Sequence, residues 1–336
     1  MSKKAKNSTS ECYIGSYIGG RNENQDSAGA IEAAIGRIIV VCDGMGAHNG
    51  GSTASQIAVK TIIDDIANAE STDSVPDVLR SAVIHANNAI MDAAEEDSSL
   101  IGMGTALVIN DDCAYATYLG DSRVYQLRGR NKVFRSFDHS MVFQSVKMGF
   151  ITEEQARLSS QSNIITKALG ISRNIEVEIY ELPYMAGDRF ILCTDGFWGA
   201  MPEKEFISKI YKGKVATALE KMSLQIDLIG IRQGGHHDNF TAAMMDVKKE
   251  SKKKAKMSLK IKILILSLIL ALAASLSLNV YMMTRAADET LKTPDSRPAA
   301  ESVQTETKTE EQKEEKSGDI EGENATPGEA GSEEQK

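Results

Sequence analysis

The sequence predicts an α+β domain built on a largely antiparallel sheet, followed by one transmembrane helix and a disordered acidic tail. Three observations support this prediction. Strand-like and helix-like segments alternate through residues 1–247. Neighbouring strand-like segments are joined at Asp111–Asp112 and at Gly120–Asp121 by connections too short for a crossover helix, which favours antiparallel pairing over a doubly wound nucleotide-binding fold. In addition, residues 263–283 contain no charged side chain.

Five segments have the composition of buried strands. Each is a short run rich in Val, Ile, Leu and Tyr, bounded by turn-forming residues. They comprise residues 36–44, 105–112, 113–128, 175–182 and 188–196. Two of them, 36–44 and 188–196, run directly into an Asp-Gly pair, which by itself is a favoured tight turn with a purely structural role.

Helical periodicity predicts two amphipathic helices and one less regular helical region. Residues 53–67 repeat apolar side chains at i, i+3, i+4 and i+7, the spacing of one helix face. Residues 76–94 show the same stripe, with Ser74 as a candidate N-cap. Residues 140–149 and 152–157 show a weaker apolar periodicity and lead into a polar stretch. We expect this region to form a mobile flap.

Composition and charge indicate a folded intracellular domain rather than a nucleic-acid-binding protein. Of the 336 residues, 42% are apolar, which is enough for a substantial core. Residues 1–247 carry a net charge near −8, so a basic surface for nucleic acid is not expected. The four cysteines are far apart and lack Cys-x-x-Cys spacing, which favours buried reduced thiols. No apolar segment of signal-peptide length follows the N-terminal lysines.

Residues 263–283 are predicted to cross a membrane once. As a helix they would span about 31 Å at roughly 1.5 Å per residue, close to the ~30 Å hydrocarbon core of a bilayer. A buried core helix is the alternative interpretation. The segment is apolar around its whole circumference, however, and no globular sequence follows it.

The lysines before this span predict its orientation. Residues 248–262 hold eight lysines, whereas only Arg285 closely follows the span. Because positive charge is retained on the cytoplasmic side, residues 1–247 are expected to be cytoplasmic and residues 284–336 to lie outside the cell membrane. Residues 286–336 contain 15 acidic and six basic residues and no aromatic one, so this tail is expected to be disordered. Residues 248–262 then form a basic juxtamembrane linker.

Five acidic residues lie at strand ends or turns, namely Asp26, Asp43, Asp121, Asp195 and Asp238. Gathering so many carboxylates at one end of a sheet would cost several kcal/mol in repulsion unless a cation neutralised them. Hard divalent ions such as Mg²⁺ and Mn²⁺ prefer oxygen ligands. The pattern therefore favours a metal centre over five unrelated turns. The glycines after Asp43 would then let a bulky anion approach the backbone.

Eight short motifs follow one another through almost all of residues 12–247. They are RNENQDS (21–27), DGMGAHNGG (43–51), GMGTA (102–106), GDSRVY (120–125), DHS (138–140), NIITKALG (163–170), TDGFW (194–198) and HDNFT (237–241). Each motif alone is a weak signal, but in this order the set resembles the metal-dependent protein phosphatase 2C (PPM) family of serine/threonine phosphatases. The resemblance implies a two-layer antiparallel β-sandwich flanked by α-helices, with a binuclear metal site at one end.

The resemblance also implies a role for each acidic residue. Asp43 corresponds to the carboxylate that bridges two Mn²⁺ or Mg²⁺ ions, and Gly44 would offer its backbone carbonyl to one of them. Asp195 and Asp238 would be ligands on either side. Asp26 would hold water bound to the metal.

Three further residues take roles from the same resemblance. Asp121, together with Asp195, corresponds to a weaker third metal site. Arg21 matches the arginine that steadies the substrate phosphate, a role that suits its planar guanidinium. Asn239 would orient the loop that carries Asp238.

Two positions depart from the family pattern. Gln25 stands where many relatives have Glu, which removes one negative charge, although an amide can still hydrogen-bond a bound water. Met45 stands where animal members carry the histidine that donates a proton, so the general acid is not assigned. His48 is a candidate, but a lone loop histidine more often orders its loop.

The chemistry implied by this site is phosphoester hydrolysis. Two divalent ions would lower the pKa of a bridging water and present hydroxide to phosphorus, without a covalent enzyme intermediate. The expected substrates are phosphoserine and phosphothreonine proteins at the cytoplasmic face of a membrane, and the family suggests pairing with a serine/threonine kinase and its substrates. Two alternatives remain: a membrane-tethered pseudophosphatase that binds phosphoproteins, and a receptor whose outer tail regulates the inner domain.

Overall fold

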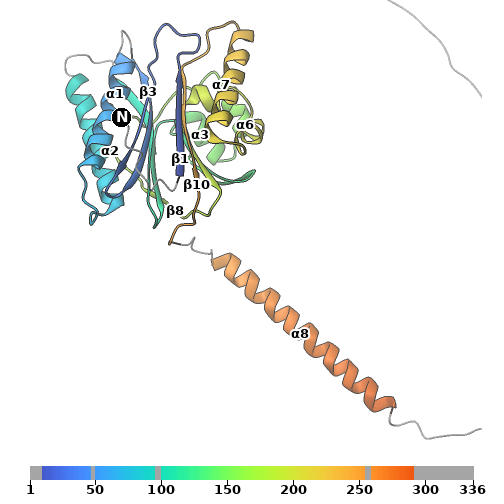
Figure 1. Ribbon diagram of the computed structural model, residues 1–336. Helices are drawn as coiled ribbons and strands as arrows, with labels where there is room; N and C mark the ends of the chain where they lie inside the picture. The colour runs from blue at the N-terminus through green and yellow to red at the C-terminus, as the bar shows by residue number, and fades with distance from the viewer. Residues whose placement is uncertain (1–9, 47–49, 95–99, 254–258, 291–336) are drawn as a thin grey trace, which may run out of the picture. The chain divides into compact units, whose positions relative to one another are not determined.

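The computed structural model describes residues 10–46, 50–94, 100–253 and 259–290. The chain divides into two compact units, Met1–Ser258 and Leu259–Lys336. Figure 1 shows the described part of the first unit as two sheets with helices on their outer faces. The larger unit is the one that carries all the predicted site residues.

Two five-stranded sheets form the centre of this unit. The first has the order β1 (Ser10–Tyr17), β10 (Phe240–Val247), β9 (Asp188–Cys193), β6 (Arg123–Arg128) and β7 (Asn131–Arg135). The second has the order β2 (Ser27–Ala33), β3 (Gly36–Met45), β4 (Ile101–Ile109), β5 (Ala114–Leu119) and β8 (Tyr180–Leu182). Neighbouring strands pair antiparallel throughout. The predicted antiparallel sandwich is therefore confirmed.

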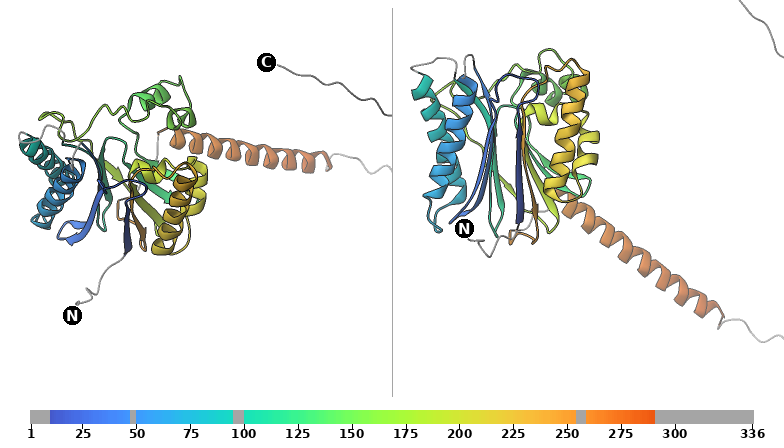
Figure 2. Two further views of the ribbon diagram at one scale, coloured as in Figure 1. Left: turned by 90° about the horizontal axis from the view of Figure 1, so that it is seen from above. Right: turned by 45° about the horizontal axis from the view of Figure 1, so that its top comes forward.

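Helices cover both outer faces of the sandwich, as the right-hand view of Figure 2 shows. The second sheet is covered by α1 (Gly50–Ala67) and α2 (Val75–Ala94). The first sheet is covered by α5 (Asp195–Trp198), α6 (Glu203–Ile210) and α7 (Val215–Arg232). A third apolar cluster fills the space between the sheets. The order of layers is thus helix, sheet, sheet, helix.

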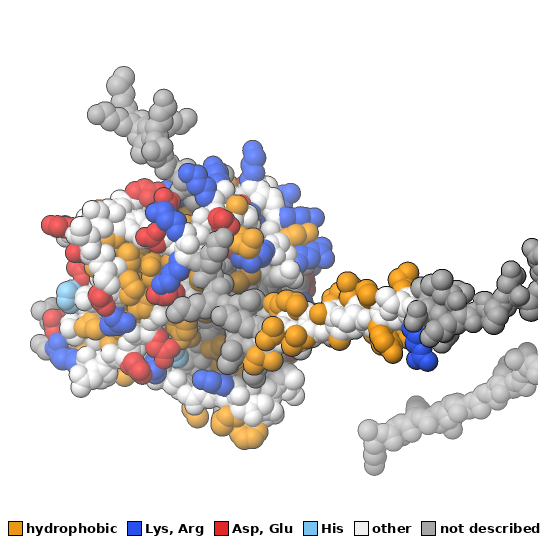
Figure 3. Space-filling view, turned by 90° about the horizontal axis from the view of Figure 1, so that it is seen from below, with side chains coloured by type: hydrophobic (Ala, Val, Ile, Leu, Met, Phe, Trp, Pro, Cys, Tyr) orange, Lys and Arg blue, Asp and Glu red, His pale blue; other side chains and the backbone are white. Residues whose placement is uncertain are grey.

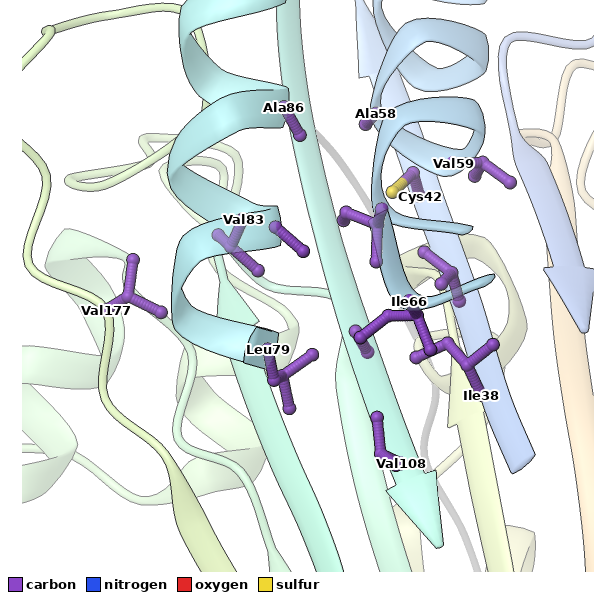
Figure 4. Packing of buried hydrophobic residues seen from close by; sticks show 14 of the residues in the cluster. Ile38, Cys42, Ala58, Val59, Ile66, Leu79, Val83, Ala86, Val108 and Val177 are labelled. Carbon is purple, nitrogen blue, oxygen red and sulfur yellow. The ribbon is translucent and has the colours of Figure 1, made fainter. Parts of the chain in front are cut away.

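The side chains of β3 alternate between two apolar clusters. Ile38 packs toward α1 and α2, where Figure 4 shows it beside Ile66. Ile39 and Val41 pack toward the opposite sheet. Because side chains of a strand alternate with a period of two, Asp43 faces the space between the sheets, like Val41. Burial of both faces explains why β3 reads as an uninterrupted apolar run.

The segment 113–128 differs from its sequence-based prediction. It contains two strands, β5 and β6, that lie in different sheets and do not pair with each other. The break at Gly120–Asp121 is therefore a crossing between the two layers and not a hairpin, in contrast to the β4–β5 connection at Asp111–Asp112, which does join an antiparallel pair. Gly120 has φ +90°, a conformation that glycine adopts without strain, and this permits the sharp change of direction.

Other predicted elements are confirmed with shifted ends. The expected strand 188–196 ends at Cys193, and Asp195 begins α5. Only Tyr180–Leu182 of the expected strand 175–182 is a strand. The flap region forms two short helices, α3 (Met141–Lys147) and α4 (Glu153–Arg157), which begin at side-chain caps. The elements that sequence periodicity missed are β1, β2, β7, β10, α5, α6 and α7.

The four cysteines are free thiols, as predicted. Cys42, Cys113 and Cys193 are buried, and Cys12 is partly buried. Burial raises the pKa of each thiol, so they are poor nucleophiles. They serve as apolar core residues.

After β10, residues 251–253 are hydrogen-bonded to the sandwich. The Ser251 hydroxyl accepts a hydrogen bond from the Tyr184 amide at 2.9 Å. The amides of Lys252 and Lys253 donate to the carbonyls of Asp111 and Asp112, each at 2.8 Å. These contacts tie Ser251 to the segment after β8, and Lys252 and Lys253 to the turn between β4 and β5.

The second unit contains α8 (Leu259–Thr290). Within it, Ile263–Arg285 has a mean hydropathy of 2.4 and none of its apolar window is buried. Figure 3 shows hydrophobic side chains along the described surface of this helix. It is long and apolar enough to cross a membrane, as the sequence predicts.

Candidate metal centre

The predicted site residues meet at one end of the sandwich, drawn uppermost in Figure 1. Each lies where a strand begins or ends, because antiparallel strands bring alternate chain ends to the same edge. Arg21 follows β1, Asp26 precedes β2, Asp43 and Gly44 lie at the end of β3, Asp121 precedes β6, Asp195 follows β9, and Asp238 and Asn239 precede β10. His48 and Ala47 lie outside the described residues.

Burial and the neighbouring acids disfavour the ionisation of Asp26, Asp43, Asp121 and Asp195. Burial raises the pKa of Asp43 well above its usual range, and repulsion from the other four acids raises it further. Burial raises the pKa of Asp26 to about 7. Burial and repulsion from Asp238 raise the pKa of Asp195 to about 6. Without a cation, this cluster cannot be ionised at neutral pH without an energetic penalty.

The donors fit an ion that keeps several waters. Among residues 10–46, 50–94, 100–253 and 259–290, no three Asp, Glu, His or Cys side chains are arranged to hold a metal ion by themselves. Asp121 is nevertheless buried, and its Oδ1 accepts no hydrogen bond from a described group. An unpartnered buried carboxylate oxygen requires a cation or a water. Mg²⁺ and Mn²⁺, which bind a few carboxylates and complete an octahedron with water, match this set.

The glycine-rich loop after Asp43 has a packing reason. A Cβ atom at Gly44 would lie 1.8 Å from the carbonyl oxygen of Gly51 at the start of α1. The Gly44 amide donates to the Gln25 carbonyl at 3.1 Å, and Gln25 Nε2 donates to the Gly46 carbonyl at 3.2 Å. Gln25 therefore ties this loop to the loop before β2. The glycines let three backbone segments approach beside Asp43, in addition to the predicted access for an anion.

Asp26 is held by a residue that the sequence did not single out. Thr194 Oγ1 donates to Asp26 Oδ2 at 2.9 Å and accepts a hydrogen bond from the Thr241 amide at 3.0 Å. The hydroxyl groups of Thr241 and Thr194 oppose the effect of burial on the pKa of Asp26. In the sequence, the only indication of this role was that Thr194 directly precedes Asp195.

Arg21 and Asp238 form an ion pair across the site. Arg21 Nη2 lies 2.8 Å from Asp238 Oδ2, and both side chains are about half exposed. Asn239 connects the two loops: its Nδ2 donates to the Ile18 carbonyl at 2.7 Å and the Glu23 carbonyl at 2.8 Å. The expected role of Asn239 in orienting the loop is consistent with these bonds.

Aromatic and charged residues link the flap to Asp121. Trp198 Nε1 donates to the Asp121 carbonyl at 3.0 Å. The guanidinium of Arg123 lies 3.3 Å from the Trp198 ring centre and donates two hydrogen bonds of 2.7 Å to Asp138. A cavity of about 90 Å³ lies between these residues and α3–α4. A larger cavity, about 630 Å³, is lined by residues around the β4–β5 turn and contains none of the predicted site residues. The site is therefore identified by its chemistry and not by cavity size.

Comparisons with known proteins agree with this geometry. The family model for protein phosphatase 2C matches residues 16–229. The serine/threonine phosphatase stp of Listeria monocytogenes is 32% identical over 235 residues, covering 67% of this chain and 91% of that protein. Protein phosphatase PhpP of Streptococcus pneumoniae is 29% identical, covering 68% and 94%.

Solved structures show the same fold. The serine/threonine phosphatase PstP/Ppp of Mycobacterium tuberculosis is 27% identical with a TM-score of 0.61, covering 71% of this chain and 99% of that one. A structure of the PstP catalytic domain in complex with two manganese ions is 27% identical with a TM-score of 0.60, at the same coverage. The chain therefore belongs to the protein phosphatase 2C family and is of the bacterial serine/threonine phosphatase type.

Proposed function

We propose that this protein is a membrane-anchored, metal-dependent phosphatase that hydrolyses phosphoserine and phosphothreonine on cytoplasmic proteins. The observation that carries the proposal is the convergence of five carboxylates at one end of the sandwich, where burial raises the pKa of four of them, Asp26, Asp43, Asp121 and Asp195. A protein that only bound phosphate would gain nothing from so much negative charge, because the acids repel the ligand. The names of the relatives from Listeria and Streptococcus support the same activity.

Four residues are proposed to hold two Mn²⁺ or Mg²⁺ ions: Asp43 between them, Asp195 and Asp238 on either side, and the Gly44 carbonyl. Asp121 and Asp195 are proposed for a weaker third ion. When bound, such ions supply an activated water as nucleophile and neutralise charge on the phosphoryl group. The relative solved with two manganese ions supports the count of two.

Other residues act directly on water and substrate in this proposal. Asp26, fixed by Thr194, accepts a hydrogen bond from the attacking water and orients it. Arg21 has a planar fork that can donate two hydrogen bonds to a phosphate. Its present partner is Asp238, so substrate binding exchanges one carboxylate contact for a phosphate contact.

Replacing Arg21 with alanine is expected to reduce kcat/KM for a phosphothreonine peptide by at least about 100-fold, because two charge-assisted hydrogen bonds worth roughly 1.5 kcal/mol or more each are lost. The affinity for Mn²⁺ should change by less than about threefold, since the arginine contributes no ligand. Steady-state kinetics and Mn²⁺ titration check both values. Arg21→Lys, which keeps the positive charge but lacks the planar guanidinium group, should recover part of the activity. A variant with unchanged kcat/KM would remove Arg21 from the phosphate site.

The direct test of the function is hydrolysis of a phosphothreonine peptide by the full chain in detergent micelles. Phosphate release is expected with Mn²⁺ or Mg²⁺ and is expected to fall to background with EDTA, because the activated water depends on the ions. Release that continues undiminished in EDTA would contradict the metal dependence. A folded protein that binds Mn²⁺ but releases no phosphate would contradict the activity and favour a phosphoprotein-binding role.

We also propose the arrangement along the chain. Residues 1–247 would form the cytoplasmic catalytic domain, residues 263–283 the membrane span, and residues 284–336 an outer acidic tail. The apolar surface of α8 supports the span. The eight lysines of residues 248–262 support this orientation and fit contact with anionic lipid headgroups.

A further inference from the structure

The side chain of His237, one residue before Asp238, is anchored on α7. Its Nε2 lies 3.0 Å from Asp227 Oδ1, and the side chain is only 14% exposed. The imidazole stacks on Phe240, with ring centres 5.9 Å apart. Because a carboxylate only accepts hydrogen bonds, Nε2 carries the proton and donates it to Asp227. His237 thus bridges the loop before β10 and the C-terminal part of α7.

Gly230 provides the space for this ring. A Cβ atom at Gly230 would lie 2.1 Å from His237 Cγ and 2.2 Å from its Nδ1. Glycine inside a helix costs about 1 kcal/mol relative to alanine, so its presence in α7 needs a reason. The close approach of the imidazole to the helix backbone supplies that reason. The Nδ1 atom itself is buried and has no hydrogen-bond partner among the described residues.

The backbone around Asp238 is held on its other side as well. The His237 carbonyl accepts a hydrogen bond from the Gly20 amide at 2.9 Å. Asn239 binds the loop that carries Arg21 through its two Nδ2 hydrogen bonds. Asp238 therefore lies between two anchored neighbours, one fixed to α7 and one fixed to the β1–β2 loop.

We infer that His237 and Asp227 are positioning residues that hold Asp238 where a divalent ion can bind it, an inference that rests on the proposed metal-dependent function. The carboxylate of Asp238 is half exposed, and its own partners are the exposed Arg21 side chain and the adjacent Asn239 amide, each at 2.8 Å, so the position of its loop depends on the anchored neighbours. The helix α7 packs on β1 and β10 through buried apolar residues and is a rigid support. Ligands held by such outer contacts bind metal more tightly because less ordering is needed on binding.

The test compares Mn²⁺ affinity of full-chain variants in detergent micelles, measured by the electron paramagnetic resonance signal of free Mn²⁺. Asp227→Ala and His237→Leu are expected to weaken Mn²⁺ binding about 10-fold, the lower end of what outer contacts of metal ligands contribute. His237→Gln, which keeps a donor near the position of Nε2, should recover most of that affinity. At saturating Mn²⁺, kcat should stay within about twofold of the wild type, since no ligand is removed.

A matched control exists on the other side of the molecule. His85 Nδ1 lies 2.7 Å from Asp65 Oδ2, between α2 and α1 and away from the metal centre. Asp65→Ala removes a similar pair and should leave Mn²⁺ affinity unchanged. Affinity equal to wild type in both Asp227→Ala and His237→Leu would overturn the inference. The Mn²⁺ affinity is measured without any turnover. A wild-type protein that binds Mn²⁺ but releases no phosphate would therefore contradict the proposed function, while the comparison of Mn²⁺ affinities would still test the inference about His237 and Asp227.

Discussion

Replacing Asp43 with asparagine is expected to lower metal-dependent phosphate release by about 1,000-fold or more, because metal ions contribute several kcal/mol and 4 kcal/mol is about 1,000-fold in rate. Asp43 lies at the end of β3, and its carboxylate is repelled by all four other acids of the site. Of the five, it is the acid proposed to contact both ions. The asparagine amide offers one neutral carbonyl oxygen, whereas the aspartate carboxylate offers two oxygens that share a negative charge, so the amide cannot bridge two cations.

The same variant should keep its fold. In the metal-free protein, asparagine replaces a buried carboxyl group whose ionisation is disfavoured by burial and by the neighbouring acids. The free energy of unfolding in EDTA should therefore stay equal or rise. Stabilisation by Mn²⁺, in contrast, should be lost. Phosphate release and thermal melting with and without Mn²⁺ check both expectations.

Asp64→Asn is the matched control for this variant. Asp64 pairs with Lys60 on the surface of α1, at 2.7 Å, and should be neutral in both measurements. Turnover of Asp43→Asn within about tenfold of the wild type would leave the metal bridge without support, because 10-fold corresponds to only about 1.4 kcal/mol.

In EDTA, the protein is expected to lose stability as the pH rises from 6.5 to 8. The pKa of Asp26 is about 7 in the folded protein, against a usual value of 3.8. Between these values the folded state binds more protons than the unfolded state, so the free energy of unfolding falls with rising pH. Asp26 alone should lower the free energy of unfolding by about 1 kcal/mol between pH 6.5 and 8, and by roughly 4 kcal/mol over the whole range from pH 4 upward. Asp43 and Asp121 act in the same direction.

Other titrating groups limit the useful pH window. Burial lowers the pKa of His139 to about 4, which makes stability rise with pH up to about 6.5 and opposes the acids there. The pKa values of Asp188 and Glu203 are lowered overall although burial raises them, because Arg128 and Lys132 bind these carboxylates, and they matter only at acidic pH. Urea unfolding at pH 6.5 and 8 in EDTA therefore reports mainly on the buried acids of the metal site, together with Asp138, whose pKa is also raised by burial.

Mn²⁺ should reverse this loss. An ion at 100 times its dissociation constant stabilises the folded state by about 2.7 kcal/mol, and it should do so more at pH 8, where the acids are ionised. Asp43→Asn should show a smaller pH dependence in EDTA than the wild type. A metal-free protein that gains stability between pH 6.5 and 8 would contradict the mutual repulsion of these carboxylates.

Several features of this protein followed from the sequence by itself. The continuous apolar run of 36–44 and the helical stripes of 53–67 and 76–94 correspond to β3, α1 and α2. These patterns are local, since the side-chain periods of strands and helices depend only on backbone geometry. The acidic residues at strand ends predicted a metal centre at the end of the sandwich where these residues meet, because like charges are rarely gathered without a cation. The uncharged run at 263–283 identified α8 for the same local reason.

Tertiary structure alone decided the remaining features, because they depend on contacts between residues far apart in the chain. The break at Gly120 reads as a hairpin, and only the assignment of β5 and β6 to different sheets shows that it crosses the sandwich. β10 has no distinct pattern of its own, yet it pairs with β1 over 200 residues away in sequence. Gly44 needs to be glycine because Gly51 approaches it, and His237 is anchored because α7 offers Asp227 and a gap at Gly230. Local periodicity cannot encode such pairs, since each depends on where the rest of the chain has packed.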